Sequence, residues 1–130
     1  MQQRDLLLIE DDAHIAEALR FILSRAGWAV SVCGDGLQAV GQVSQMQPAV
    51  VVLDMMLPGR SGLDVLADLR ADPGLKAVPV LVLSASGQSI AAAETEVMRA
   101  VGEGVGPTVV MTKPFSNAAV LAAVQELAGG

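Results

Sequence analysis

The amino-acid sequence predicts an α/β protein, a three-layer doubly wound (βα)5 sandwich with a parallel sheet between helices. Short apolar runs rich in Val and Leu alternate with stretches that space apolar residues three or four positions apart, which is typical of buried parallel strands and amphipathic helices. Hydrophobic residues make up 52% of the 130 residues but aromatic residues only 2%, so an aliphatic core is expected. This length suits a single domain over residues 1–130. Strict alternation of strands and helices implies right-handed crossovers, with helices on both faces of the sheet.

The first strand and helix are predicted from residues 6–9 and the polar residues that follow them. The apolar run LLLI ends in three consecutive acids, Glu10, Asp11 and Asp12, and a helical pattern comes next. Asp12 suits the helix N-cap, where its carboxylate can accept hydrogen bonds from free backbone N–H groups. Gly27 ends the helix. Capping therefore accounts for one of the three acids and leaves two to be explained.

Four further units repeat this plan along the chain. The remaining strands are expected at residues 29–33, 50–54, 80–84 and 109–111, and the remaining helices at about 37–47, 62–70, 90–101 and 120–127. Gly, Pro and Asp residues separate most of these elements and turn the chain. The glycine-rich segment 102–106 is predicted to be the only loose part of the fold.

Asp54 stands where the third strand stops, and a carboxylate there needs a chemical reason. In open parallel sheets, ligands bind beyond the carboxyl ends of the strands. The flavodoxin-like strand order 2-1-3-4-5, which we adopt for a sandwich of this class, would bring Glu10 and Asp11 next to Asp54. Ser84 and Lys113 end the two strands on the other side. A strand end, a turn residue or a solvated lysine would explain each of them singly, but all of them at one edge indicate a shared site.

Three acids at one edge of a sheet destabilise the fold unless a cation is present. Two carboxylates about 4 Å apart repel by roughly 1–4 kcal/mol at effective dielectric constants of about 80 to 20. Mg²⁺ prefers a few carboxylates, a carbonyl and several waters, which this edge can supply. A hydroxyl and an ammonium beside a metal-bound carboxylate form a site for a tetrahedral anion such as a phosphoryl group.

Four motifs of the sequence resemble the receiver domain of two-component response regulators. They are LLLIEDD at residues 6–12, VVLDMMLPGRSGLDVL at 51–66, LVLSAS at 81–86 and MTKPF at 111–115. The resemblance covers nearly the whole chain. It implies that Asp54 is the phosphoacceptor in a phosphorelay and that Ser84 and Lys113 bind the phosphoryl group. It also implies a cis peptide bond between Lys113 and Pro114.

The same resemblance implies a Mg²⁺ site and a signalling role. Asp11 and Asp54 would ligate the ion directly, Glu10 would hold a metal-bound water, and the Met56 carbonyl would complete the protein ligands. A partner histidine kinase or histidine phosphotransfer protein would donate the phosphoryl group, which the domain would then slowly hydrolyse. On this interpretation the chain is a signalling domain and not an enzyme, although small phosphodonors would also phosphorylate it.

Composition limits the other partners and the compartment. A net charge of −6 without a cluster of Lys or Arg argues against direct binding to nucleic acid or to an anionic membrane. No apolar run reaches the length of a membrane span, so a cytoplasmic protein is expected. The single cysteine, Cys33, cannot form an internal disulfide and is expected to be buried, and one histidine does not suffice for the usual zinc sites. A homodimer is left open.

Three other classes of protein remain as alternatives. A pseudo-receiver would only dock partners, and the intact acids argue against it. A haloacid-dehalogenase-like phosphatase needs a second acid two residues after its nucleophile, where Met56 stands. A flavodoxin-like FMN protein would meet repulsion between its phosphate and Glu10 and Asp11. The sequence names neither the kinase nor the output, and it does not distinguish a stand-alone regulator from the N-terminal fragment of a longer one.

Two features depart from the family pattern. Val110 stands three residues before Lys113, where an aromatic switch residue is usual, and valine has one restricted χ angle and no ring to move. The segment between Ser84 and Lys113 is longer than usual by about two helical turns. We therefore expect activation to remodel residues 84–107 more than the face around Val110.

Overall fold

The computed structural model describes residues 4–84, 89–102 and 104–129. Its strands are β1 (Arg4–Ile9), β2 (Trp28–Cys33), β3 (Val50–Asp54), β4 (Val80–Ser84) and β5 (Thr108–Thr112). Its helices are α1 (Ala13–Arg25), α2 (Gly36–Met46), α3 (Gly62–Ala71), α4 (Ile90–Val101) and α5 (Asn117–Leu127). Each helix follows a strand, as the sequence predicts. Within this part of the chain, no helix combines the length and the apolar character that crossing a bilayer requires.

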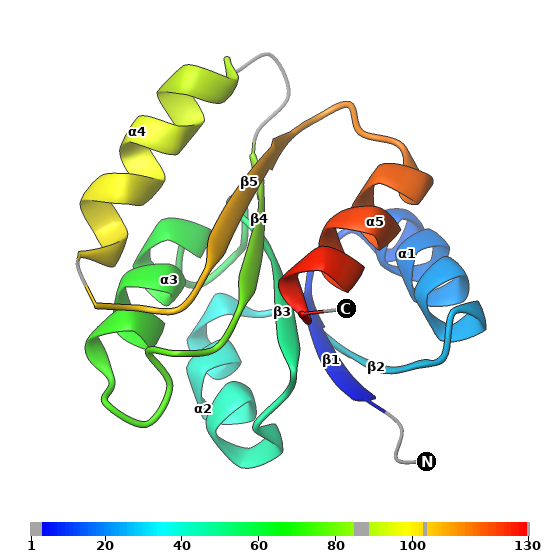
Figure 1. Cartoon of the computed structure of the whole chain (residues 1–130), viewed down its shortest axis with the longest axis horizontal. Helices are drawn as coiled ribbons and strands as arrows, with labels where there is room; N and C mark the ends of the chain where they lie inside the picture. The colour runs from blue at the N-terminus through cyan, green and yellow to red at the C-terminus, as the bar shows by residue number, and fades with distance from the viewer. Residues whose placement is uncertain (1–3, 85–88, 103, 130) are drawn as a thin grey trace.

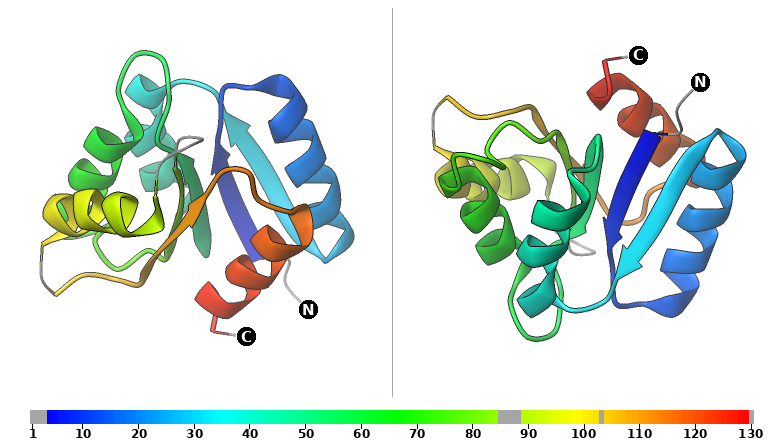
Figure 2. Two further views of the ribbon diagram at one scale, coloured as in Figure 1. Left: turned by 90° about the horizontal axis from the view of Figure 1, so that it is seen from above. Right: turned by 90° about the horizontal axis from the view of Figure 1, so that it is seen from below.

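The described strands form one parallel sheet in the order β2-β1-β3-β4-β5, which confirms the predicted topology. Helices α1 and α5 cover one face, and α2, α3 and α4 cover the other, so the molecule has three layers (Figure 1). The two views in Figure 2 show the same division of the helices. Because β2 lies outside β1, the carboxyl ends of β1 and β3 lie side by side at the point where the strand order reverses.

Two aliphatic cores fill the spaces between the sheet and its helix layers. Alternate strand residues point to opposite faces, so Leu7 and Leu53 pack toward α2, α3 and α4, whereas Leu8 and Val52 pack toward α1 and α5. Every residue of β3 and β4 is buried, which explains why their sequences are apolar without alternation. Cys33 is buried, as predicted.

The beginning of β1 differs from its sequence prediction, whereas the caps of α1 agree with theirs. The strand begins two residues before the apolar run, because the exposed residues Arg4 and Asp5 still pair with the first residues of β2. The strand β2 likewise begins one residue early, at Trp28. Asp12 caps α1 as predicted, accepting two backbone N–H bonds, and Gly27 follows the helix with a φ of 101°. The apolar run of β1 therefore underestimates the length of a strand whose first residues are polar.

The glycine-rich segment before β5 is not uniformly loose, and that prediction is wrong for Gly106. The Gly106 N–H donates to the Lys76 carbonyl at 2.7 Å. A Cβ at this position would lie 2.2 Å from the carbonyl oxygen of Ala77, so only glycine permits this close approach of two backbones. Gly102 and Gly104 are different: their φ angles are 72° and 69°, and no atom lies near the position of an added Cβ.

Arg70, near the end of α3, joins two loops at the amino ends of β4 and β5. Its side chain is 4% exposed. The guanidinium donates hydrogen bonds to the carbonyls of Lys76, Val78 and Pro107 and to the hydroxyl of Thr108. No carboxylate pairs with it among the residues that the structure describes, and burial lowers its pKa. Arg70 therefore holds the entrances to both strands by bonds to backbone oxygens.

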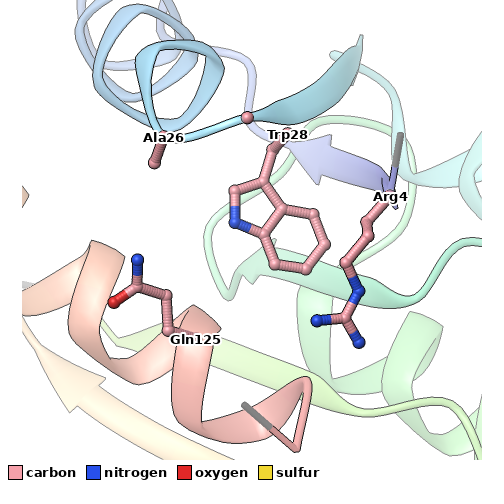
Figure 3. Close-up of a pocket in the computed structure, with 5 residues that line it drawn as sticks. Arg4, Ala26, Trp28 and Gln125 are labelled. Carbon is pink, nitrogen blue, oxygen red and sulfur yellow. The ribbon is translucent and has the colours of Figure 1, made fainter. Parts of the chain in front are cut away.

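A second arginine lies at the amino end of β1. The Arg4 guanidinium carbon lies 5.2 Å from the ring centroid of Trp28, and its Nη2 donates to the Ala128 carbonyl at 2.8 Å. Figure 3 shows the two side chains beside a cavity of about 310 Å³, which Gln125 of α5 also lines. Arg4 thus links β1, β2 and the end of α5, on the edge of the sheet opposite the carboxyl ends of the strands.

Candidate functional site

The carboxyl edge of the sheet gathers the beginnings of the helices. The helix N-caps at this edge are Asp12, Asp35, Ser61, Ser89 and Ser116, and each accepts a hydrogen bond from a backbone N–H of its own helix. The first view in Figure 2 looks onto this edge from above. Because helix N-termini carry partial positive charge, the edge favours acids and anions.

Asp54 is the last residue of β3 and is only 2% exposed. Lys113 Nζ lies 3.1 Å from its Oδ2, which makes a hydrogen-bonded ion pair. The backbone N–H of Met56 donates to its Oδ1 at 2.9 Å. Each carboxylate oxygen is therefore held by a donor, and the side chain has a fixed orientation at the end of the strand.

Two further acids follow β1 at the switch point and meet Asp54. Ligand oxygens of Glu10, Asp11 and Asp54 all lie within 4.8 Å of one another, and we call these three residues the carboxylate cluster. Glu10 is 2% exposed, and its Oε2 accepts the Asp12 N–H at 3.1 Å. Burial, with the neighbouring Asp54 as a further cause, raises the pKa of Glu10 to about 8. Asp11 is exposed.

The carboxylate cluster fits a hard dication. Its three carboxylates are oxygen ligands of the kind that Mg²⁺ prefers, and one of them faces solvent, where water can complete a coordination shell. Glu10 Oε1 is buried and has no hydrogen-bond partner among the described residues. A buried acid with a free oxygen and a raised pKa is a group that a cation or an ordered water would satisfy.

Ser84 and Lys113 complete the edge from β4 and from the residue after β5. In the sheet register Asp54 lies opposite Leu83, so Ser84 lies one residue beyond Asp54 along the strand direction. Ser84 in turn lies opposite Thr112, so Lys113 lies one residue beyond Ser84. The Ser84 side chain is fully buried, and in the described part of the chain its Oγ has no partner. The peptide bond between Lys113 and Pro114 is cis, as the resemblance implies.

Met56 lies on the loop that leaves β3, and its side chain is 63% exposed. The residue before it is fixed at both backbone groups: the Met55 N–H donates to Leu83 O at 3.0 Å, and the Met55 carbonyl accepts the Gly62 N–H at 3.0 Å. A Cβ on Gly62 would lie 2.2 Å from Asp54 O, so glycine is required for α3 to begin this close to β3. The Met56 carbonyl as a metal ligand stays a prediction.

The structure also shows lining residues that sequence reasoning missed. A cavity of about 480 Å³ adjoins the ion pair and is lined by His14, Ile15, Ala18, Lys113, Pro114, Phe115 and Asn117. The MTKPF motif contained three of these residues, but nothing in the sequence joined them to the beginning of α1. Of the other sequence-predicted positions, Ala85 and Ser86 of the LVLSAS motif lie outside the described residues.

Comparisons with known sequences agree with this geometry. A family model for the response regulator receiver domain matches residues 6–125. The chain is 43% identical over 90 residues to the DNA-binding response regulator MtrA of Mycobacterium tuberculosis (strain ATCC 25618 / H37Rv). That match covers 69% of this chain and 38% of MtrA, so the chain spans less than half the length of this relative.

Solved structures show the same fold. The receiver domain of the Francisella response regulator 1452 has a TM-score of 0.83 and 26% identity, over 97% of each chain. The receiver domain of a sensor histidine kinase from Pseudomonas aeruginosa has a TM-score of 0.78 and 23% identity, over 99% of this chain and 100% of that one. That second structure has a magnesium ion coordinated in its active site cleft. The chain therefore belongs to the response regulator receiver domain family.

Proposed function

We propose that this receiver domain is a phosphoacceptor in which Asp54 takes a phosphoryl group from a histidine kinase or a histidine phosphotransfer protein. Receiver domains interact with histidine kinases, and phosphorylation and Mg²⁺ binding are general properties of the family. The observation that supports the assignment to Asp54 is its position: it is buried at the switch point, bound to Lys113, and within 4.8 Å of two other acids. An Asp54 oxygen would attack phosphorus while the phosphorus–nitrogen bond of the donor histidine breaks.

Four residues would hold Mg²⁺. Asp11 and Asp54 would bind it directly, Glu10 would bind it through a water, and the Met56 carbonyl would be the remaining protein ligand. When bound, the ion supplies positive charge that offsets the negative charge of the phosphoryl oxygens and of the carboxylate cluster. The cation would also lower the raised pKa of Glu10, because a nearby positive charge favours the ionised carboxylate.

Lys113 and Ser84 would bind the transferred group. The Lys113 ammonium now pairs with Asp54 Oδ2, and it could move its charge to a phosphoryl oxygen as the aspartate oxygen becomes bonded to phosphorus. The buried Ser84 hydroxyl has no partner among the described residues, and it would donate to another phosphoryl oxygen. We also propose that the domain accepts phosphoryl groups from small donors and slowly hydrolyses its own aspartyl phosphate.

Val110 and the segment after α4 affect how the conformation of this domain would change on activation. Val110 is partly buried and packs against the core beneath α2, α3 and α4, with Val82 as its partner in β4. The valine has no ring to exchange between two positions, whereas Gly102 and Gly104 provide conformational freedom after α4. We keep the proposal that activation changes residues 84–107 more than the Val110 face, and part of that segment, residues 85–88, lies outside the described chain.

Direct contact between this chain and nucleic acid is not part of the proposal. MtrA is named as a DNA-binding protein, but only 38% of it matches this chain. The net charge of −6 would oppose approach to the phosphates of a duplex.

Intact-mass measurement after incubation with acetyl phosphate and Mg²⁺ tests the phosphoacceptor assignment. We expect one added phosphoryl group on the wild type and none on Asp54→Asn, because that amide is a poor nucleophile. Asp5→Asn, which makes the same chemical change at an exposed position of β1, is the matched control and should be labelled like the wild type. Equal labelling of the wild type and Asp54→Asn would remove Asp54 from this role.

A further inference from the structure

The loop between β3 and α3, residues 55–61, carries an ion pair that the proposed chemistry does not use. Arg60 Nε donates to Asp68 Oδ2 at 2.8 Å, and Arg60 Nη2 donates to Asp68 Oδ1 at 3.1 Å. Asp68 lies on α3, and both side chains are about two-fifths exposed. Two parallel bonds fix the relative orientation of a guanidinium and a carboxylate, which one ammonium contact would not do.

The backbone of Arg60 is held on its other side by the beginning of α2. A Cβ on Gly36 would lie 2.0 Å from the Arg60 carbonyl oxygen, so only glycine lets these two backbones approach. The Pro58 carbonyl accepts the N–H groups of Gly36 at 3.2 Å and of Arg60 at 2.9 Å. Arg60 therefore joins the loop to α2 through its backbone and to α3 through its side chain.

The other end of this loop reaches the carboxylate cluster. Met55 is fixed by backbone bonds to Leu83 and Gly62, and the Met56 N–H donates to Asp54 Oδ1. The N–H of Met56 is therefore held as well, whereas its carbonyl belongs to the next peptide unit. The direction of its carbonyl depends on how the following residues, up to Arg60, are held.

We propose that Arg60 is a positioning residue for the metal site, because its bidentate pair with Asp68 limits the conformations of the loop that carries the Met56 carbonyl. The inference rests on the proposed function, since it takes that carbonyl as a Mg²⁺ ligand. Arg60 itself contacts neither the ion nor the phosphoryl group. The pair acts by removing other conformations of the loop, so its loss lowers metal affinity while the fold remains.

Calorimetric titration with Mg²⁺ tests this role on the whole chain. Arg60→Lys, Arg60→Met and Asp68→Ala should each weaken Mg²⁺ binding by about two- to fivefold, the size expected for a pair of this exposure. Simple charge effects predict a different pattern: Arg60→Met, which removes a positive charge, would strengthen Mg²⁺ binding, and Arg60→Lys would leave it unchanged. Combining Arg60→Met with Asp68→Ala should weaken binding no further than either change alone.

The matched control removes the same charge elsewhere. Arg20 lies on α1, 3.9 Å from Glu17 in an exposed pair, and Arg20→Met should leave Mg²⁺ affinity close to that of the wild type. A pair that merely stabilised the fold would lower the melting temperature in the Arg60 variants without changing their affinity. Wild-type affinity in a folded Arg60→Met protein would overturn the proposal.

Amide hydrogen exchange at Met56, measured by NMR without metal, gives a second readout. Exchange at this N–H should be faster in Arg60→Lys and Asp68→Ala than in the wild type, and unchanged in Arg20→Met. If wild-type protein neither binds Mg²⁺ nor accepts a phosphoryl group, the proposed function fails, and Met56 exchange alone decides the positioning role. Unchanged Met56 exchange in both Arg60→Lys and Asp68→Ala would then reject it.

Discussion

The carboxyl ends of the strands (the carboxyl edge) and their amino ends (the amino edge) differ in the buried groups that they hold. At the carboxyl edge, Glu10 and Asp54 bring acids into the fold, and atoms of Glu10 and Ser84 have no partner among the described residues. At the amino edge, the guanidinium groups of Arg4 and Arg70 bind backbone carbonyls. Arg70 makes three bonds to carbonyls and one to the Thr108 hydroxyl. Of the Arg70 donors, only Nε has no partner in the described part of the chain.

The direction of the helices explains this division of charge. Each helix runs back across the sheet, so its positive N-terminus lies at the carboxyl edge and its negative C-terminus lies at the amino edge. Acids are therefore favoured at one edge and arginines at the other. At the amino edge, both terminal nitrogens of Arg70 donate to protein oxygens. At the carboxyl edge, Glu10 and Ser84 have polar atoms without partners among the described residues, which the proposed function assigns to a ligand.

Removing the Arg70 guanidinium from the amino edge should give the largest effect on stability. Arg70→Met keeps a long apolar stem but removes the donors to the carbonyls of Lys76, Val78 and Pro107. The Lys76 and Pro107 carbonyls keep one backbone bond each, from the N–H groups of Gly106 and Val80. We expect a loss of about 2–4 kcal/mol in the free energy of unfolding, because hydrogen bonds from a charged group contribute about 1.5–3 kcal/mol each and local rearrangement recovers part of the loss. Urea denaturation measures the loss. Arg99→Met, on the exposed side of α4, is the control and should change stability little.

Adding Mg²⁺ at the carboxyl edge should give the next largest effect on stability, and it should raise stability. On the proposed function, Mg²⁺ would bind the folded carboxylate cluster and not the unfolded chain, so it should raise stability by about 2.7 kcal/mol at a concentration one hundred times its dissociation constant. Asp11→Asn should reduce this gain while relieving repulsion in the metal-free protein. Thermal melts with Mg²⁺ and with a chelator would show both effects. A melting temperature that does not respond to millimolar Mg²⁺ would contradict the metal site.

The sequence predicted the carboxyl edge better than the amino edge, for a physical reason. Asp54 and Ser84 stand at the ends of apolar runs, and the topology of parallel strands brings such ends together whatever the details of packing. Arg70 follows a helical pattern and has the sequence character of any basic residue in the last turn of a helix. Its bonds to Pro107 and Thr108, more than 35 residues away, depend on how two loops meet. Local patterns carry no information on such contacts.

The same limit applies to the loops around the site. Gly106 reads as one more glycine of a loose segment, and only its approach to Ala77 shows that it is required. Arg60 and Asp68 are eight residues apart, which matches no helical pairing interval because Arg60 lies before α3 begins. Sequence motifs thus identified the residues that we propose to carry the chemistry, whereas the residues that hold the loops required the structure.

A pH titration of stability without metal should sharpen the comparison further. Burial raises the folded-state pKa of Glu10 from 4.5 to about 8, so proton binding to the folded state contributes stability that is fully present below pH 4.5 and is lost as the pH rises through about 8. Glu10→Gln cannot ionise and lacks this dependence. The stability of the wild type relative to Glu10→Gln should therefore fall by about 2 kcal/mol between pH 6 and pH 8. Parallel pH profiles of the two proteins would argue against a raised pKa.

Two cation–aromatic pairs offer the smallest and most local test, because they differ in burial and in the hydrogen bond that Arg4 also makes to the Ala128 carbonyl. Arg4 lies over Trp28, which is 6% exposed, and Arg25 lies over Phe21, which is 64% exposed. Arg4→Met should cost about 0.5–1 kcal/mol, since it removes a partly desolvated ring contact and the bond to the Ala128 carbonyl. Arg25→Met should cost less, because water screens the pair on the outer surface of α1.

Urea denaturation of these two variants would measure the difference, and the fluorescence of Trp28, the single tryptophan, would report on the amino edge directly. Its emission should shift in Arg4→Met and not in Arg25→Met, because only Arg4 contacts the ring. If the two substitutions cost the same, neither the burial of the ring nor the bond to the Ala128 carbonyl would add to what Arg4 contributes. The arginine at the amino edge would then be a surface residue of the ordinary kind, and Arg70 alone would distinguish that edge from the carboxyl edge.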